Sequence, residues 1–121
     1  MYPPIFQVVD ASVAVQALLG PSPVRFGPFG EADPQPELPY AVWQTVYGSP
    51  DNYISGAPDT DRFGTQIDVF AREAVDARDV AKAIRDAIEP HAHITAFNGE
   101  SRDPVTRSYR YSLTADWIVN R

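Results

Sequence analysis

The stretch PYAVWQTVYGSPDNYISGAPDTDRFGTQIDVFA (residues 39–71) contains two strand-like segments, residues 40–47 and 63–71, on either side of a polar loop at residues 48–61. Tight hairpins need about two to five connecting residues, so a loop of this length is more than a turn. Tyr53 and Ile54 place bulky apolar side chains near its middle. We interpret the loop as an arm that orders against another surface. The alternatives are a floppy insertion, or a loop that folds Tyr53 back onto its own domain.

The composition is that of an ordinary globular domain. The chain has 121 residues, of which 44% are hydrophobic and 21% charged, and this predicts one domain over residues 1–121 with a single core. The absence of cysteine excludes disulfides, thiol catalysis and thiolate metal sites. No apolar run approaches the ~18 residues that a membrane span needs. The N-terminus has neither the basic start nor the apolar stretch of a signal peptide, so we expect a cytoplasmic location and no membrane partner.

The charge balance argues against nucleic-acid binding. The formal net charge is −6, whereas a protein that grips phosphates usually presents a basic patch. All but one of the ten basic residues are arginine, the exception being Lys82. Arginine suits bidentate pairing at interfaces, although a GC-rich genome produces the same bias and is the explanation we favour.

The first third of the chain predicts a helix followed by an extended connection. Two prolines suit a helix start, and apolar residues then recur at helical spacing over residues 3–19, until Gly20 ends the pattern. Ser12 allows a second reading, in which it caps a separate short helix after a break near Ala11. A short edge strand is predicted over residues 24–26.

The remainder alternates strands with one helix. Residues 40–47, 63–71, 91–98 and 106–118 are predicted strands, and the alternation is clearest in the last of them. An apolar stripe at three- and four-residue spacing predicts a helix over residues 74–89. The sequence therefore predicts an α+β fold: a single domain with a mostly antiparallel sheet of four to five strands and two helices covering one face.

Residue patterns that carry catalysis or metal binding are weak here. His91 and His93 point to one face of a strand, but no third ligand is positioned by spacing. Asp51, Asp59 and Asp61 lie in the loop without the glycine and glutamate of a calcium-binding EF-hand. No serine stands in a nucleophile elbow, and no glycine run forms a phosphate cradle. We therefore expect no catalytic residue, no cofactor-binding residue, no metal site and no cofactor.

Several of these motifs occur together in a known family. The order is a helix ending in Leu18-Leu19-Gly20, then the Pro39-Tyr40 strand start, a long loop closing with residues 62–71, and the alanine-rich helix over residues 77–88. In this order the chain resembles the tail completion (tail terminator) proteins of long-tailed siphophages and related prophages. The resemblance extends from about residue 3 to residue 118.

The resemblance implies a structural virion protein rather than an enzyme, and no cofactor. It implies a homo-oligomer of six subunits, a hexameric ring that caps the tail tube and meets the head connector. The partners would be the major tail tube protein and the head–tail connector protein, with DNA passing through the lumen without specific binding. The expected location is the virion tail, after assembly in the host cytoplasm. The family supplies no fixed functional residues to transfer to this sequence.

Interface residues are therefore predicted from physical chemistry alone. A ring subunit needs exposed apolar anchors, sheet edges that pair with neighbours, and an arm that orders on assembly. The residues that offer these features, in the loop and at the predicted edge strand, are Tyr53, Ile54, Asp59, Asp61, Arg62, Val24 and Phe26.

Two other functions fit the same sequence. One is another neck protein of the virion, such as a head–tail connector, which also combines small size, acidity and ring assembly. The other is a monomeric α+β enzyme or ligand-binding domain, in which the loop at residues 48–61 would be a lid over the sheet. The mass of the native protein separates a ring from a monomer.

Overall fold

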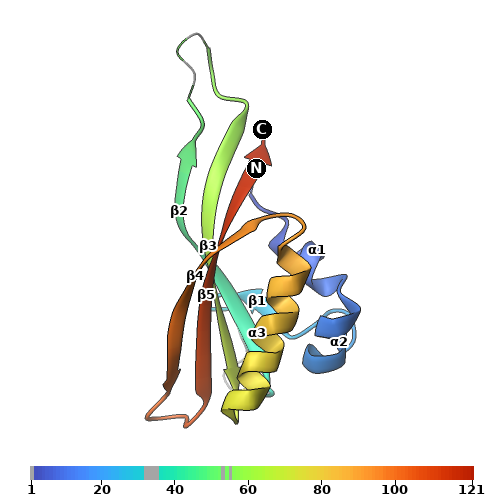
Figure 1. Ribbon diagram of the computed structural model, residues 1–121. Helices are drawn as coiled ribbons and strands as arrows, with labels where there is room; N and C mark the ends of the chain where they lie inside the picture. The colour runs from blue at the N-terminus through green and yellow to red at the C-terminus, as the bar shows by residue number, and fades with distance from the viewer. Residues whose placement is uncertain (1, 32–35, 53, 55) are drawn as a thin grey trace.

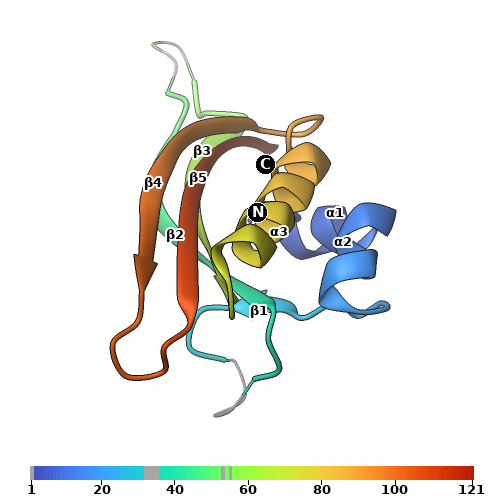
Figure 2. The ribbon, with the colours of Figure 1, turned by 60° about the horizontal axis from the view of Figure 1, so that its bottom comes forward.

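A five-stranded sheet runs the length of the molecule, and three helices lie on one of its faces (Figures 1 and 2). The computed structural model describes residues 2–31, 36–52, 54 and 56–121. The helices are α1 (Ile5–Asp10), α2 (Val13–Leu19) and α3 (Ala74–Ile88), and the strands are β1 (Phe26–Pro28), β2 (Tyr40–Pro50), β3 (Thr60–Ala71), β4 (His93–Arg102) and β5 (Tyr109–Asn120). The predicted α+β domain with a mostly antiparallel sheet is thereby confirmed.

The strand order in the sheet is β1-β2-β3-β5-β4, so β3 is central and β1 and β4 form the edges. The pairs β2–β3, β3–β5 and β4–β5 are antiparallel, and only the short β1 pairs with its neighbour β2 in parallel. Strand β3 pairs with β5 along its whole length, from Thr60 opposite Asn120 to Ala71 opposite Tyr109. This long central pair of antiparallel strands sets the long axis of the domain (Figure 1).

The alternation along β3 and β5 explains which face the helices cover. Ile67, Leu113 and Ala115 are fully buried on the same face, and Trp117 beside them is 2% exposed. The indole Nε1 of Trp117 donates a hydrogen bond to the hydroxyl of the buried Thr65 at 3.1 Å. The one polar group on this aromatic side chain thus has a partner inside the core.

Helix α3 closes the core through its apolar stripe. Small and branched residues recur at three- and four-residue spacing and are buried against the sheet: Ala77, Val80, Ala81, Ile84 and Ile88. Asp76 lies in the first turn, where the helix dipole favours a carboxylate.

The N-terminal segment forms two helices instead of the single helix predicted over residues 3–19. The Ser12 hydroxyl accepts a hydrogen bond from the backbone N–H of Val15 at 3.3 Å, and Ser12 itself is extended, as expected of an N-cap. The second reading of the sequence, with a break near Ala11, is the one that the structure has. Three helices therefore cover the sheet where two were predicted.

The strand limits also differ from the predicted ones. The pairing of β2 with β3 shifts its register between Thr45 and Tyr47. Beyond this shift the two strands stay paired as far as Pro50. The loop predicted over residues 48–61 is consequently shorter, at residues 51–59. The predicted strands 24–26, 91–98 and 106–118 lie at Phe26–Pro28, His93–Arg102 and Tyr109–Asn120.

Candidate assembly interface

The β2–β3 loop, residues 51–59, projects beyond the end of the sheet, and we call it the arm (Figure 1). Ile54 lies within it with a fully exposed side chain (109% of its reference area). The side chain of Ile54 is thus an aliphatic group in contact with solvent. Exposed aliphatic side chains are typical of residues that become buried when a protein associates with a partner. Tyr53, the other predicted anchor, lies outside the described residues.

Two ion pairs hold the base of the arm. The Asp51 carboxylate accepts hydrogen bonds from the Thr60 hydroxyl at 2.8 Å and from Arg62 Nε at 2.9 Å. Asp61 binds the guanidinium of Arg121 through both carboxylate oxygens, at 3.0 to 3.1 Å. The first pair joins the loop to β3, and the second joins β3 to the residue that follows β5. Together they fix the direction in which the arm leaves the sheet.

The ionisation of these groups reflects the same contacts. The hydrogen bond from Thr60, followed by that from Arg62, lowers the pKa of Asp51 below its ordinary value of 3.8. The hydrogen bond to Asp61 raises the pKa of Arg121. These contacts therefore favour the ionised forms of Asp51 and Arg121.

The predicted interface residues thus have separate roles. Asp61 and Arg62 engage in the ion pairs below the arm, and the Asp59 carbonyl accepts a hydrogen bond from the backbone N–H of Arg121 at 2.9 Å. These three residues position the arm. Among the predicted interface residues that the structure describes, only Ile54 has an exposed apolar side chain.

The interface role of Val24 and Phe26 stays a prediction, and it would involve the backbone of this edge, because both side chains are buried. Each is 4% exposed and belongs to the hydrophobic core. The Phe26 ring packs on Trp43 with centroids 4.7 Å apart. The chain turns both side chains inward because β1 lies on the same sheet that the helices cover, and only its backbone remains at the edge.

The opposite edge, strand β4, was missed as an interface candidate. Nine of its ten residues are exposed and Ile94 is half-buried. Phe97, a large aromatic in this strand, is 57% exposed. The sequence offers one signal, because Asn98 is polar where the alternation of Ile94 and Ala96 continues to an apolar position, and one of the two register shifts against β5 occurs there. Long exposed edges of this kind are sites at which another strand can add.

A group of exposed apolar side chains surrounds the base of the arm: Tyr2, Val46, Tyr47 and Ile118, each between 45% and 74% exposed. The Tyr47 ring lies directly over Gly64, where a Cβ would collide with it. Glycine at this position therefore allows the aromatic ring to lie flat on the strand. The apolar surface at this end of the molecule extends from the arm onto β2 and β5.

On the face of the sheet opposite the helices, the middle of β3 and β5 is polar and internally paired. Asp68, only 6% exposed, accepts from Arg110 at 3.1 Å and from the Gln66 amide at 3.2 Å. Asn98 donates to the hydroxyl of Ser112 at 3.2 Å. The charges of Asp68 and Arg110 neutralise each other, so this part of the face offers no concentrated charge.

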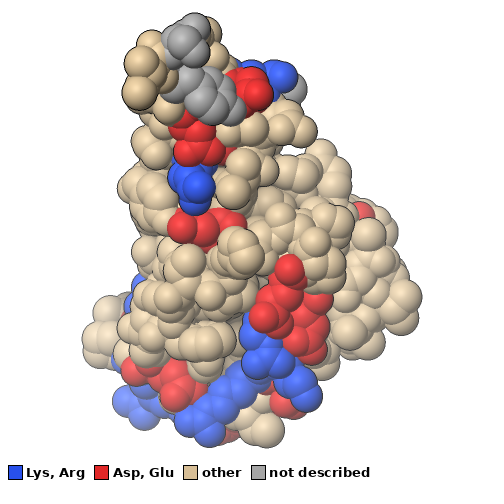
Figure 3. Space-filling model, turned by 45° about the horizontal axis from the view of Figure 1, so that its top comes forward, with Lys and Arg blue, Asp and Glu red and all other residues tan. Residues whose placement is uncertain are grey.

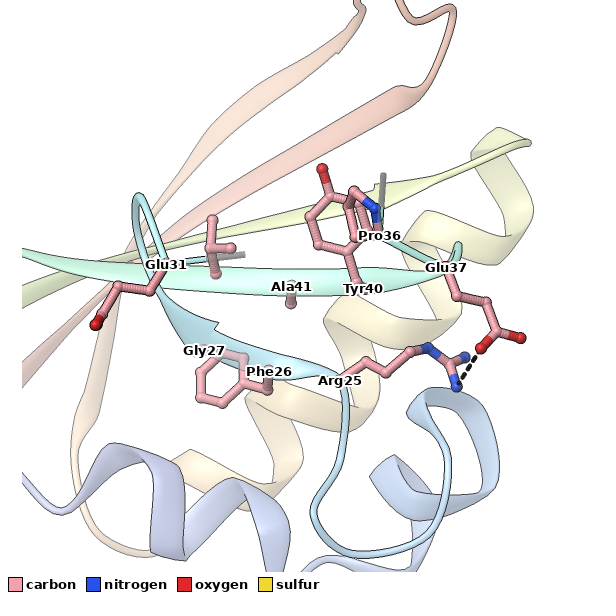
Figure 4. A pocket seen from close by; sticks show the side chains of 9 residues that line it. Arg25, Phe26, Gly27, Glu31, Pro36, Glu37, Tyr40 and Ala41 are labelled. Carbon is pink, nitrogen blue, oxygen red and sulfur yellow. Dashed lines mark ion pairs between the residues drawn. The ribbon is translucent and has the colours of Figure 1, made fainter. Parts of the chain in front are cut away.

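A pocket of about 340 Å³ lies where β1 and β2 meet the connection that follows β1 (Figure 4). Arg25 and Glu37 meet at one end of it, with 3.7 Å between Nη1 and the carboxylate, and Arg25 Nε also donates to the Pro39 carbonyl at 2.9 Å. Burial, and secondarily the charge of Asp103, raises the pKa of Tyr40 on the same side. These contacts hold the connection against the sheet, which is a structural role.

The two histidines lie close together at the start of β4 and line the same shallow pocket. His91 precedes β4 and His93 begins it, and both are exposed. Across residues 2–31, 36–52, 54 and 56–121, no group of three or more His, Asp or Glu side chains is arranged to hold a metal ion. No helix within these ranges has the length and apolar character needed to cross a bilayer.

Comparison with known proteins identifies the family. Residues 3–120 match the family model described as "Tail completion protein gp17". The chain therefore belongs to this family, whose members are structural proteins of phage tails, and its place is in the tail of a virion. A comparison with curated protein sequences found no match.

A solved structure shares the fold. It is a chain from the "Virion of native gene transfer agent (GTA) particle", with a TM-score of 0.68 and 17% sequence identity over 97% of this chain and 92% of that one. The similarity extends over the sheet, the helices and nearly the whole length of both chains.

Proposed function

We propose that this chain is the tail terminator subunit, which forms a ring that caps the tail tube and joins it to the head connector. The ring is a hexamer assembled in the host cytoplasm, its partners are the major tail tube protein and the head–tail connector protein, and DNA passes through its lumen without specific binding. The protein has no catalytic activity and needs no cofactor in this role.

The observation that carries the proposal is the arm. Its base is held by the pairs Asp51–Arg62 and Asp61–Arg121, while Ile54 in the loop is fully exposed. An arm that is fixed at its base and carries an exposed apolar side chain is suited to contact another molecule. It is less suited to act as a lid over this domain's own sheet. The arm points away from the sheet, whereas a lid would fold over it (Figure 1).

The sheet edges support ring formation. Strand β1 pairs only with residues 41–43 of β2, so the rest of β2 has no partner strand on its outer side among the described residues. Strand β4 is open in the same sense at the opposite edge. Unlike surfaces on opposite sides of a subunit favour head-to-tail contacts, which close into rings when the rotation allows it.

The charge of the chain suits a channel for DNA. Six copies carry 6 × −6 = −36 formal charges. An acidic ring repels phosphate and does not grip the duplex as it slides.

The test is the mass of the native protein, alone and with purified tail tubes, for the intact chain and for a variant that lacks residues 52–57. We expect a hexamer or a tube-bound ring for the intact chain. The deletion should leave thermal unfolding unchanged and weaken assembly, because the ion-paired base remains. A chain that stays monomeric with tail tubes and instead binds head particles would indicate a connector. Unfolding caused by the deletion would show that the arm belongs to the fold and would remove the argument.

A further inference from the structure

Three arginines lie together at the end of the sheet opposite the arm, and we call them the arginine cluster: Arg72, Arg102 and Arg107. Arg72 follows the last residue of β3, Arg102 is the last residue of β4, and Arg107 lies in the turn that joins β4 to β5. Tyr109 pairs with Ala71 on one side and with Arg102 on the other, so the three segments meet at one end of three neighbouring strands. In Figure 3, basic side chains gather in a band at the end of the molecule opposite the arm, with acidic side chains beside them.

The guanidinium group of Arg102 is fixed in place within this cluster. Its Nη1 donates hydrogen bonds to the backbone carbonyls of Arg107, at 2.6 Å, and of Arg72, at 3.3 Å. Its Cζ atom lies 5.7 Å from the centroid of the Tyr109 ring, within the range of a cation–π interaction. Both hydrogen bonds use the same nitrogen, and Nε and Nη2 donate none to the residues that the structure describes. These donors are therefore available to a ligand.

The positive charges of the arginine cluster are not neutralised by the described part of the chain. Every other arginine forms an ion pair with a carboxylate, whereas Arg72, Arg102 and Arg107 form none with the described residues. The carboxylate of Asp103, in the same turn, accepts hydrogen bonds from the backbone N–H groups of Val105 and Thr106, at 2.8 and 3.0 Å. It is thus engaged in the turn and leaves the cluster without a counter-ion.

The backbone of Arg107 is unusual for an arginine. Across residues 2–31, 36–52, 54 and 56–121, it is the one residue other than glycine with a positive φ, at 64°. Its N–H donates to the Asp103 carbonyl at 2.9 Å, so the turn itself requires this conformation. Glycine or asparagine adopts it at less cost than arginine does. The fold therefore does not explain why an arginine stands here, and residues in such a conformation are often found at functional sites.

We propose that the arginine cluster binds the carboxylates of an acidic segment of a partner protein. A guanidinium group binds a carboxylate through two parallel hydrogen bonds, and a donor that is already fixed loses little conformational freedom on binding. Val105, in the same turn, is 87% exposed and offers an apolar contact beside the cations. The segment should therefore carry an apolar residue next to its acidic ones. This inference goes beyond the proposed ring, because it concerns the end opposite the arm and does not depend on the number of copies.

Duplex DNA suits this site less well than an acidic protein segment does. Residues 72–73 and 102–108 together carry 3 − 2 = +1, and the whole chain carries −6. So small a local charge on an acidic protein gives little long-range attraction for a polyanion. Recognition here depends instead on short, directional hydrogen bonds and on an apolar contact, which a protein segment supplies.

An NMR titration of the intact, ¹⁵N-labelled chain tests the site directly. The probe is a peptide of two Asp-Glu-Leu-Asp-Glu repeats, and the matched control peptide carries Asn and Gln in place of Asp and Glu. We expect saturable shifts of the Nε–H signal of Arg102 and of the backbone N–H signals of the turn at residues 103–108. The Nε–H signal of Arg121, which is paired with Asp61, should not move. The control peptide should bind at least tenfold more weakly.

Substitutions separate a binding role from a structural one. Arg107→Gly removes one cation and suits the positive φ, so it should weaken peptide binding at least fivefold while thermal unfolding stays unchanged or moves to higher temperature. Arg102→Lys keeps the charge but loses the planar group, and should also weaken binding at least fivefold. Lys82→Gln is the control, since Lys82 likewise forms no ion pair with the described residues but lies on α3. It should change binding less than twofold.

The contrary outcomes are equally defined. The proposal is overturned if the acidic peptide does not bind at millimolar concentration, if the control peptide binds as well, or if Lys82→Gln weakens binding as much as Arg107→Gly does. Duplex DNA that shifts the same signals at lower concentration than the peptide would assign the site to phosphate and also overturn it. The mass of the native protein is measured separately, so a failure of this site leaves the ring proposal standing, and a monomeric chain that binds the peptide does the reverse.

Discussion

Replacing Trp117 measures how much of the domain's stability rests on the buried face of β5. This side chain is 2% exposed, and an aromatic of its size buries about 200 Å². At about 25 cal/mol per Å² the burial is worth at most about 5 kcal/mol, since the unfolded chain already hides part of that area. We expect Trp117→Ala to lower the free energy of unfolding by ~3–5 kcal/mol, the usual range for an aromatic lost from a core.

A second variant separates the hydrogen bond from the packing. Trp117→Phe keeps most of the apolar area but removes the donor to the Thr65 hydroxyl, which is 1% exposed. The Thr65 hydroxyl still lies 3.5 Å from the Ala115 carbonyl, so we expect a loss near the lower end of the ~1–3 kcal/mol range for an unsatisfied buried group.

The assay is urea denaturation followed by far-ultraviolet circular dichroism, which does not depend on tryptophan as the probe. The control is Ile118→Ala, the next residue, which faces the other side of the sheet and is 53% exposed. It should change stability by no more than about 0.5 kcal/mol. A similarly small effect for Trp117→Ala would refute the assigned facing of β5 and the packing argument built on it.

Two further predictions concern single contacts, and a third concerns ligands. Gly64→Ala should destabilise the domain by about 1 kcal/mol, because the added Cβ displaces the Tyr47 ring. The loss should vanish when Tyr47 is also replaced by alanine, and a double-mutant cycle followed by urea denaturation measures this. The pKa of Asp51 is lowered in the folded state, so its ionised carboxylate contributes to stability above pH 3.8, and this contribution is lost as the pH falls through the folded-state pKa. A pKa of 3.8 or higher for the Asp51 carboxyl, measured by NMR titration, would contradict this. Zinc, calcium, ATP and duplex DNA should leave thermal unfolding unchanged, and a saturable stabilisation of about 2.7 kcal/mol from a ligand at ~100 Kd would argue for a binding function.

The parts of the fold that the sequence predicts are those set by local periodicity. The alternation along β5 and the apolar stripe of α3 depend on neighbouring residues, and the structure buries Leu113 and Ile84 as those patterns indicate. The loop was predicted too long because a register shift, which no local pattern signals, carries β2 on to Pro50.

The interface prediction was limited by sheet order. A short strand such as β1 reads as an exposed edge, but its partner β2 and the helices above it bury Phe26. The sequence predicts a strand at β4 but not its place in the sheet, and in the structure nothing pairs with its outer side among the residues that are described. Which strand becomes an edge depends on contacts between segments far apart in the sequence, and a single sequence does not record them.

The central position of β3 has a mechanical consequence. The strand begins at Thr60, at the foot of the arm, and ends at Ala71, with two residues between it and the start of α3 at Ala74. At about 3.3 Å per residue it is a continuous element roughly 40 Å long, flanked by β2 and β5. A tensile load on the arm acts along the strands, so the backbone hydrogen bonds on both sides resist it together in shear and do not open one after another. A force applied to the arm is therefore transmitted along β3 to the start of α3.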